Sequence, residues 1–107
     1  MHTQALHYTM TAWRQDFHAH PELGFEEHRT AARVAALLTE FGLTVETGVG
    51  GTGVVAVLER GEPKNDGSNT IAAIGLRADM DALPFQEVNQ FSHRSTREGV
   101  MHACGHD

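Results

Sequence analysis

A change in the spacing of apolar residues is the feature that most constrains how this chain can fold. The large apolar side chains between residues 5 and 19 are Leu6, Met10, Trp13 and Phe17. Their intervals of four, three and four trace one face of a helix. Residues 54–58, in contrast, form an almost continuous apolar run rich in β-branched side chains, which is typical of a strand buried on both faces. A chain with both patterns packs helices on a sheet, so the predicted fold class is α/β.

A second helix is predicted by apolar residues at the i, i+3, i+4, i+7 spacing. These residues are Ala31, Val34, Leu37, Leu38 and Phe41. Gly42 should end this helix. Glu26 and Glu27 are expected in its first turn, where negative charge meets the positive end of the helix dipole, and we interpret them as helix-start charges.

The predicted sheet is mostly parallel or mixed, with strands near residues 44–46, 54–59 and 70–78. Residues 48–53, Gly-Val-Gly-Gly-Thr-Gly, fit the G-x-G-x-x-G dinucleotide-binding pattern letter for letter. That pattern works by presenting a helix N-terminus to a pyrophosphate, whereas these glycines lead into a β-branched strand. We therefore reject the dinucleotide hypothesis and interpret the segment as a flexible turn between strands.

Length and charge narrow the classes of function. The 107 residues are enough for one small domain, and the balance of 14 acidic against 8 basic residues gives a net charge of −6. Without a cluster of Lys and Arg, a nucleic-acid or anionic-membrane partner is disfavoured. The single cysteine cannot form an internal disulfide, and the first 30 residues lack a secretory pattern, so we expect a cytoplasmic protein.

Polar residues gather where the first helix should end. Pro21 disfavours helical backbone at His20, so the helix is expected to stop there. His18, His20 and Glu22 could then form a metal-ligand cluster or simply a polar helix terminus, with imidazoles near the negative end of the dipole. Residue types alone favour the terminus.

Charged residues also follow the apolar run at 71–76. Asp79 and Asp81 come as this predicted central strand ends, which is where ligands bind in open α/β sheets. They could equally belong to a surface turn and accept local backbone hydrogen bonds. The following segment, 86–99, is polar, and we interpret it as a surface loop that contains Glu87 and Glu98.

The last seven residues place the only cysteine, Cys104, two positions from His106. Side chains at this spacing point the same way in extended backbone, so both could bind one ion there. A thiolate with an imidazole suits zinc, manganese, cobalt or nickel rather than calcium or magnesium. The alternative is that Cys104 is a small buried apolar residue and the histidines are polar loop residues.

Three motifs together resemble the N-acyl-amino-acid amidohydrolases, the branch of the dinuclear metallopeptidases that includes hippurate hydrolases and auxin-conjugate hydrolases. The motifs are His20-Pro21-Glu22-Leu23-Gly24-Phe25-Glu26-Glu27, Arg77-Ala78-Asp79-Met80-Asp81-Ala82-Leu83-Pro84 and His102-Ala103-Cys104-Gly105-His106-Asp107. Their order and spacing match the family from about residue 13 to residue 107. The family fold that the resemblance implies is the catalytic domain of a dinuclear metallohydrolase.

The resemblance also assigns roles to single residues. Cys104 matches the thiolate that bridges the metals, His106 matches a ligand to one ion, and Asp79 matches the aspartate behind the metals that orients the catalytic group. Arg77 stands where the peptidase branch carries a metal-binding histidine, which favours the amidohydrolase branch. For the other polar motif residues we expect hydrogen bonding that fixes the ligand loop. These are His102, Asp81 and Asp107.

The family implies two divalent ions, Zn, Mn, Co or Ni, a small N-acyl amino acid as substrate and a homo-oligomer. Its general base, remaining ligands and inserted dimerisation domain would lie beyond residue 107. Residues 1–107 are therefore expected to be the N-terminal portion of the catalytic domain and to be inactive alone. The alternative is a non-catalytic metal-binding or interaction fragment.

Overall fold

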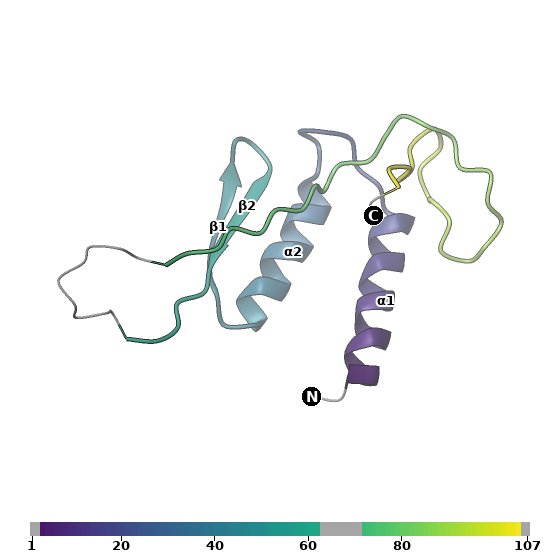
Figure 1. Cartoon of the computed structure of the whole chain (residues 1–107). Helices are drawn as coiled ribbons and strands as arrows, with labels where there is room; N and C mark the ends of the chain where they lie inside the picture. Colours follow the sequence, from purple (N-terminus) through teal and green to yellow (C-terminus); the bar gives the residue numbers. More distant parts are fainter. Residues whose placement is uncertain (1–2, 63–71, 106–107) are drawn as a thin grey trace.

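The computed structural model describes residues 3–62 and 72–105, and its two helices precede a two-stranded sheet (Figure 1). Helix α1 spans Thr3–Ala19 and helix α2 spans His28–Glu40; strand β1 spans Thr44–Val49 and strand β2 spans Gly53–Val57. Both predicted helices and the α/β class are confirmed. None of the described helices is long and apolar enough to cross a membrane.

Both helices end where helix-stopping residues follow them in the sequence. Helix α1 stops at Ala19, just before the fully buried Pro21, as the proline rule predicts. Helix α2 ends one residue before its C-cap, Phe41, and Gly42 then takes a left-handed φ of 85°. Because only glycine adopts this conformation without strain, the predicted helix stop at Gly42 is confirmed.

The glycine-rich segment is a turn, as predicted, and it joins β1 and β2 into an antiparallel hairpin. The register pairs Thr44 with Val57 and is shifted between Thr47 and Val49. Gly51 has a φ of 111°, and a Cβ at Gly53 would collide with the carbonyl oxygen of Val49. The glycines are therefore explained by backbone geometry, without a nucleotide.

The sheet differs from the prediction in three respects. The described strands are antiparallel, because a tight turn joins them directly. Strand β2 is not buried on both faces: Val55 and Val57 are exposed, since α2 is the described helix that packs against the hairpin. The third predicted strand is absent over 72–78, the part of it that the structure describes.

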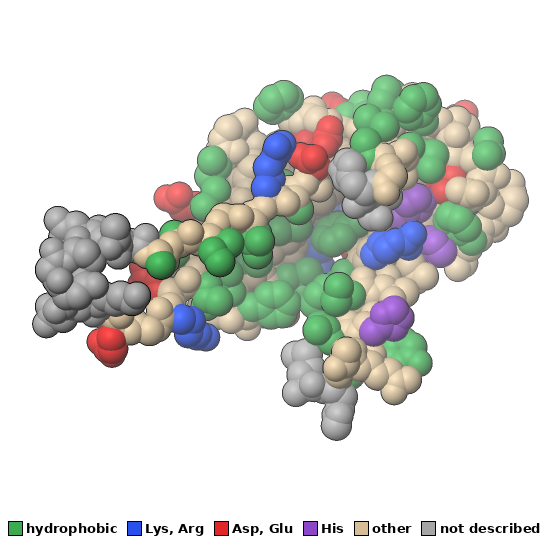
Figure 2. Space-filling view, in the orientation of Figure 1, with side chains coloured by type: hydrophobic (Ala, Val, Ile, Leu, Met, Phe, Trp, Pro, Cys, Tyr) green, Lys and Arg blue, Asp and Glu red, His purple; other side chains and the backbone are tan. Residues whose placement is uncertain are grey.

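Residues 72–81 instead run in extended form past the hairpin and α2 (Figure 1). Ile74 and Leu76 are 91% and 95% exposed. A central strand needs hydrogen-bonded neighbours, and no described segment pairs with this stretch. Figure 2 shows hydrophobic side chains on the surface along this part of the chain, beside the grey segment.

Candidate metal and catalytic site

Backbone hydrogen bonds join the first motif to the second, and the second motif to the residue just before the third. The amide of Ala82 donates to the carbonyl oxygen of Glu22 at 2.7 Å, within a parallel bridge between Leu23 and Ala82. Leu83 and Met101 exchange two backbone hydrogen bonds, of 2.9 and 3.1 Å, in an antiparallel bridge. Segments that are far apart in the sequence therefore lie side by side, and the residues on either side of these bridges form one candidate site.

Asp79 lies at the edge of this site in an ion pair. Its Oδ1 accepts a hydrogen bond from Nη2 of Arg77 at 2.9 Å. Both side chains are exposed, so the pair itself adds little to stability.

Asp79 and Asp81 line a pocket of about 340 Å³ between the 24–27 loop, the hairpin turn and residues 77–81. The carboxylate of Asp81 lies close to Gly24: a Cβ placed on Gly24 would be 3.7 Å from Oδ2 of Asp81. Phe25, also in the lining, is 79% exposed and has a φ of 66°, which is unusual for an aromatic residue. Both aspartates of the second motif therefore line an open depression in the surface.

The third motif is only partly described. Cys104 is a half-buried free thiol, and the ring of His102 lies 6.5 Å from that of His18, centroid to centroid. His106 and Asp107 fall outside the described residues.

Within residues 3–62 and 72–105, no three His, Cys, Asp or Glu side chains are grouped so that they could hold an ion. This described donor set does not make a complete metal site. The metal roles of Cys104 and His106 thus stay predictions, and we derive no catalytic step through a metal.

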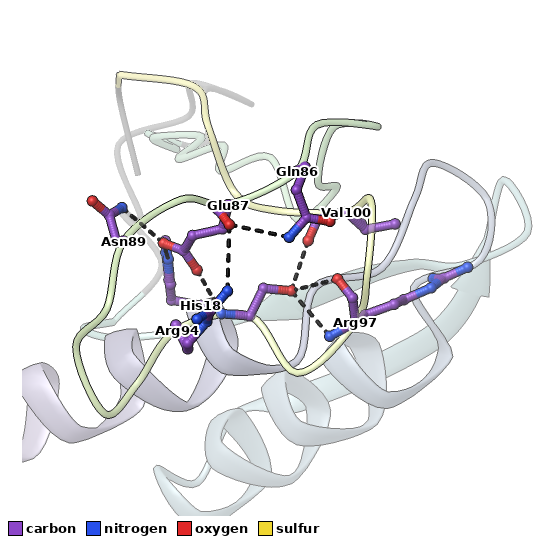
Figure 3. Close-up of polar contacts among 8 residues, drawn as sticks. His18, Gln86, Glu87, Asn89, Arg94, Arg97 and Val100 are labelled. Atoms are coloured by element: carbon purple, nitrogen blue, oxygen red, sulfur yellow. Dashed lines mark hydrogen bonds and ion pairs between the residues drawn. The ribbon is translucent and has the colours of Figure 1, made fainter.

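The segment predicted to be a surface loop instead contains the most buried large polar side chain of the described chain. Glu87 is 2% exposed. Its Oε2 lies 2.7 Å from Nε2 of His18 and accepts a hydrogen bond from Asn89 at 2.9 Å, while its Oε1 accepts one from the Ser95 amide at 2.5 Å (Figure 3). Both carboxylate oxygens are therefore engaged.

Burial and hydrogen bonding shift the pKa of Glu87 in opposite directions. Burial raises it, but the hydrogen bonds from Asn89, from the Ser95 amide and from His18 outweigh burial and lower the pKa to about 2. At neutral pH this side chain is a firmly held carboxylate.

His18 and His20 do not form a ligand cluster with Glu22 in the described structure. His18 is buried against Glu87, and Nδ1 of His20 lies 2.9 Å from the carbonyl oxygen of Asp16. The favoured interpretation as a polar helix terminus holds for His20. It holds for His18 as well, which is the basic residue in the last turn of α1, although the burial of its imidazole was not predicted.

Glu22 has a role that the sequence analysis missed. Its carboxylate accepts hydrogen bonds from the amides of Arg29 and Thr30, at 3.0 and 2.6 Å, and from Oγ1 of Thr30 at 2.7 Å. Burial raises its pKa, but these hydrogen bonds lower the pKa overall. Glu22 thus caps α2 from outside the helix, whose N-cap residue makes no side-chain cap.

Glu26 and Glu27 lie before α2 rather than in its first turn, which corrects the prediction. Glu27 is buried, and its carboxylate accepts hydrogen bonds from the Phe25 amide and from Oγ1 of Thr52 in the hairpin turn. Burial raises the pKa of Glu27, but these contacts lower it overall. Glu27 therefore ties the start of α2 to the hairpin.

The chain is similar to known proteins in sequence and in fold. Residues 75–107 match the model of the Peptidase family M20/M25/M40. The chain is 52% identical over 94 residues to a hippurate hydrolase of Campylobacter jejuni, a match that covers 88% of this chain and 23% of the relative. It is 46% identical over 96 residues to an N-acyl-L-amino acid amidohydrolase of Geobacillus stearothermophilus, covering 90% of this chain and 24% of the relative.

Among solved structures, the Bacillus subtilis YXEP protein, described as a dinuclear metal binding peptidase from the M20 family, superposes with a TM-score of 0.81 at 36% identity. The match covers 98% of this chain and 28% of that one. The fold of this chain thus matches part of the fold of that M20 family protein. The family match over residues 75–107 and the similarity to these relatives confirm the resemblance, and the chain spans about a quarter of the length of the curated relatives it matches.

Proposed function

We propose that this chain is part of a metal-dependent amidohydrolase that cleaves the amide bond of N-acyl amino acids, such as N-acetyl or N-benzoyl derivatives. The observation that carries the proposal is that the Leu23–Ala82 and Leu83–Met101 bridges join the first motif to the second and the second motif to the residue just before the third. The names of the hippurate hydrolase and amidohydrolase relatives support the substrate class.

In this proposal Cys104 and His106 supply part of the ligand set for two divalent ions, of Zn, Mn, Co or Ni. Such ions would polarise the amide carbonyl and activate a water molecule. Asp79, which pairs with Arg77 beside the pocket, orients the site. The remaining motif residues hold the ligand loop by hydrogen bonds; these are His102, Asp81 and Asp107.

The described structure adds a reason why Glu87 is not the general base. A base for amide hydrolysis works best with a pKa near the working pH, whereas the pKa of Glu87 is about 2 and both of its oxygens are occupied. Glu98 is exposed on the same loop. Neither glutamate is therefore assigned as the base in this proposal, and we expect the 107-residue chain alone to be inactive.

The test compares the 107-residue chain with a longer protein that carries it, using N-acetyl and N-benzoyl amino acids with added manganese, zinc, cobalt or nickel. The longer protein should hydrolyse at least one of them, whereas the short chain should not exceed a metal-only control. Asp79→Ala should abolish most turnover in the longer protein, and Glu98→Gln should leave it unchanged. Turnover by the short chain, or an Asp79→Ala protein with full kcat, would contradict the assigned roles.

A non-catalytic metal-binding or interaction fragment is the second candidate function. The exposure of Ile74 and Leu76 favours it, because fully exposed apolar side chains on extended backbone invite a partner. The intact mass of the native protein decides between the two, since a species of 11.7 kDa would support the fragment. Homo-oligomerisation belongs to the first candidate and stays a prediction.

A further inference from the structure

The Leu83–Met101 bridge closes a loop that is ordered around one buried carboxylate, that of Glu87. This carboxylate has no role in the function proposed above. Inside the loop, the Gly99 amide donates to Oε1 of Gln86 at 2.7 Å, and the Thr96 amide donates to the carbonyl oxygen of Ala19 at 2.9 Å. The loop is thus fastened both to itself and to the end of α1.

Two chains of contacts lead from Glu87 to the segment that carries Cys104. Through Oε1, Glu87 accepts from the Ser95 amide, and Oγ of Ser95 donates to the carbonyl oxygen of Val100 at 2.6 Å (Figure 3). Val100 is itself buried, directly before the bridge residue Met101.

Through Oε2, the same carboxylate holds Nε2 of His18 at 2.7 Å. The ring of His18 then packs near the ring of His102, two residues before Cys104. Other rings also surround the His18 ring: its centroid lies 5.8 Å from that of Phe91 and 5.9 Å from that of His93.

We propose that Glu87 is a positioning residue that fixes the segment 100–104, and with it Cys104, by holding Ser95 with one oxygen and His18 with the other. The role needs both oxygens to accept hydrogen bonds. An amide has only one such oxygen, so Glu87→Gln keeps the shape of the side chain while it loses part of the network. This inference concerns the site of the proposed function, but its test uses neither metal nor hydrolysis.

The test measures how fast iodoacetamide alkylates Cys104, the only cysteine in the 107-residue chain. Glu87→Gln should raise the rate roughly tenfold, because losing a charge-assisted hydrogen bond to a buried group shifts a local equilibrium by about that factor. Ser95→Ala removes the hydroxyl contacts to Val100 and Arg97 but keeps the Ser95 amide on Glu87, and it should raise the rate less. Glu98→Gln, an exposed glutamate of the same loop, is the matched control and should not change it.

Denaturant separates a local effect from general unfolding. Alkylation through local opening is nearly insensitive to low urea, whereas alkylation through global unfolding rises steeply with urea. We expect the increase in alkylation rate in Glu87→Gln and in Ser95→Ala to be insensitive to low urea concentrations. An unchanged rate in Glu87→Gln, an equal rise in Glu98→Gln, or an added rate with the urea dependence of global unfolding would each overturn the positioning role. Because these outcomes do not depend on catalysis, they leave the proposed function to its own test.

Discussion

Replacing Glu22 should loosen the start of α2, although Glu22 lies outside that helix. Its carboxylate satisfies the amides of Arg29 and Thr30, two of the four donors that the first turn of a helix leaves unpaired. Losing a cap costs about 0.5–2 kcal/mol, and losing a negative charge near the positive end of the dipole costs up to about 1 kcal/mol more.

Amide hydrogen exchange measures this effect residue by residue. In Glu22→Ala the Thr30 amide should exchange roughly five- to thirtyfold faster, the factor that corresponds to 1–2 kcal/mol. Glu22→Gln should lie between Glu22→Ala and the unchanged protein, because it keeps one acceptor and loses the charge. Glu26→Ala removes an exposed glutamate nearby and serves as the control. A change of less than about twofold at Thr30 in Glu22→Ala, or an equal change in the control, would refute the capping argument.

Two further predictions concern the core and the surface. The pKa of Glu87 in the folded state is about 2, below its ordinary value of 4.5. Its ionised form therefore stabilises the fold fully above about pH 4.5, and this stabilisation is lost as the pH falls toward 2. Glu87→Gln should therefore lower the free energy of unfolding at pH 7 by about 3 kcal/mol, with a difference that shrinks in acid; a difference independent of pH in urea unfolding would contradict this. The exposed Ile74 and Leu76 should make the 107-residue chain self-associate or bind a hydrophobic dye, which Ile74→Lys with Leu76→Lys should reduce; a strictly monomeric, dye-free chain by sedimentation and fluorescence would count against it.

The helices and the turn could be predicted from the sequence because their causes are local. Apolar spacing defines α1 and α2, and the glycines between β1 and β2 meet the backbone needs of a tight turn. The burial of Glu87 could not be predicted in this way, since its partner His18 lies 69 positions away and the residues around it are ordinary loop formers.

Glu22 did leave a signal. Helix α2 has Glu27 rather than Ser, Thr, Asp or Asn at its N-cap, so some other acceptor had to satisfy its first amides. The predicted strand at 70–78, in contrast, could not be judged from its own residues. An apolar, β-branched run indicates a capacity to pair, but pairing also requires a neighbour, and the described residues offer none.

The bridges between the motifs also determine when the site can form during folding. Glu22 and Ala82 are joined by a single backbone hydrogen bond, although most of the chain lies between them. Closing so long a loop costs entropy that one hydrogen bond does not repay, whereas α2 and the hairpin need only nearby residues. The hairpin and helix should therefore form first and shorten the effective loop, and the pocket with Asp79 and Asp81 should form among the last parts of the molecule. Mutations at these bridges would then mainly speed unfolding and leave the folding rate almost unchanged.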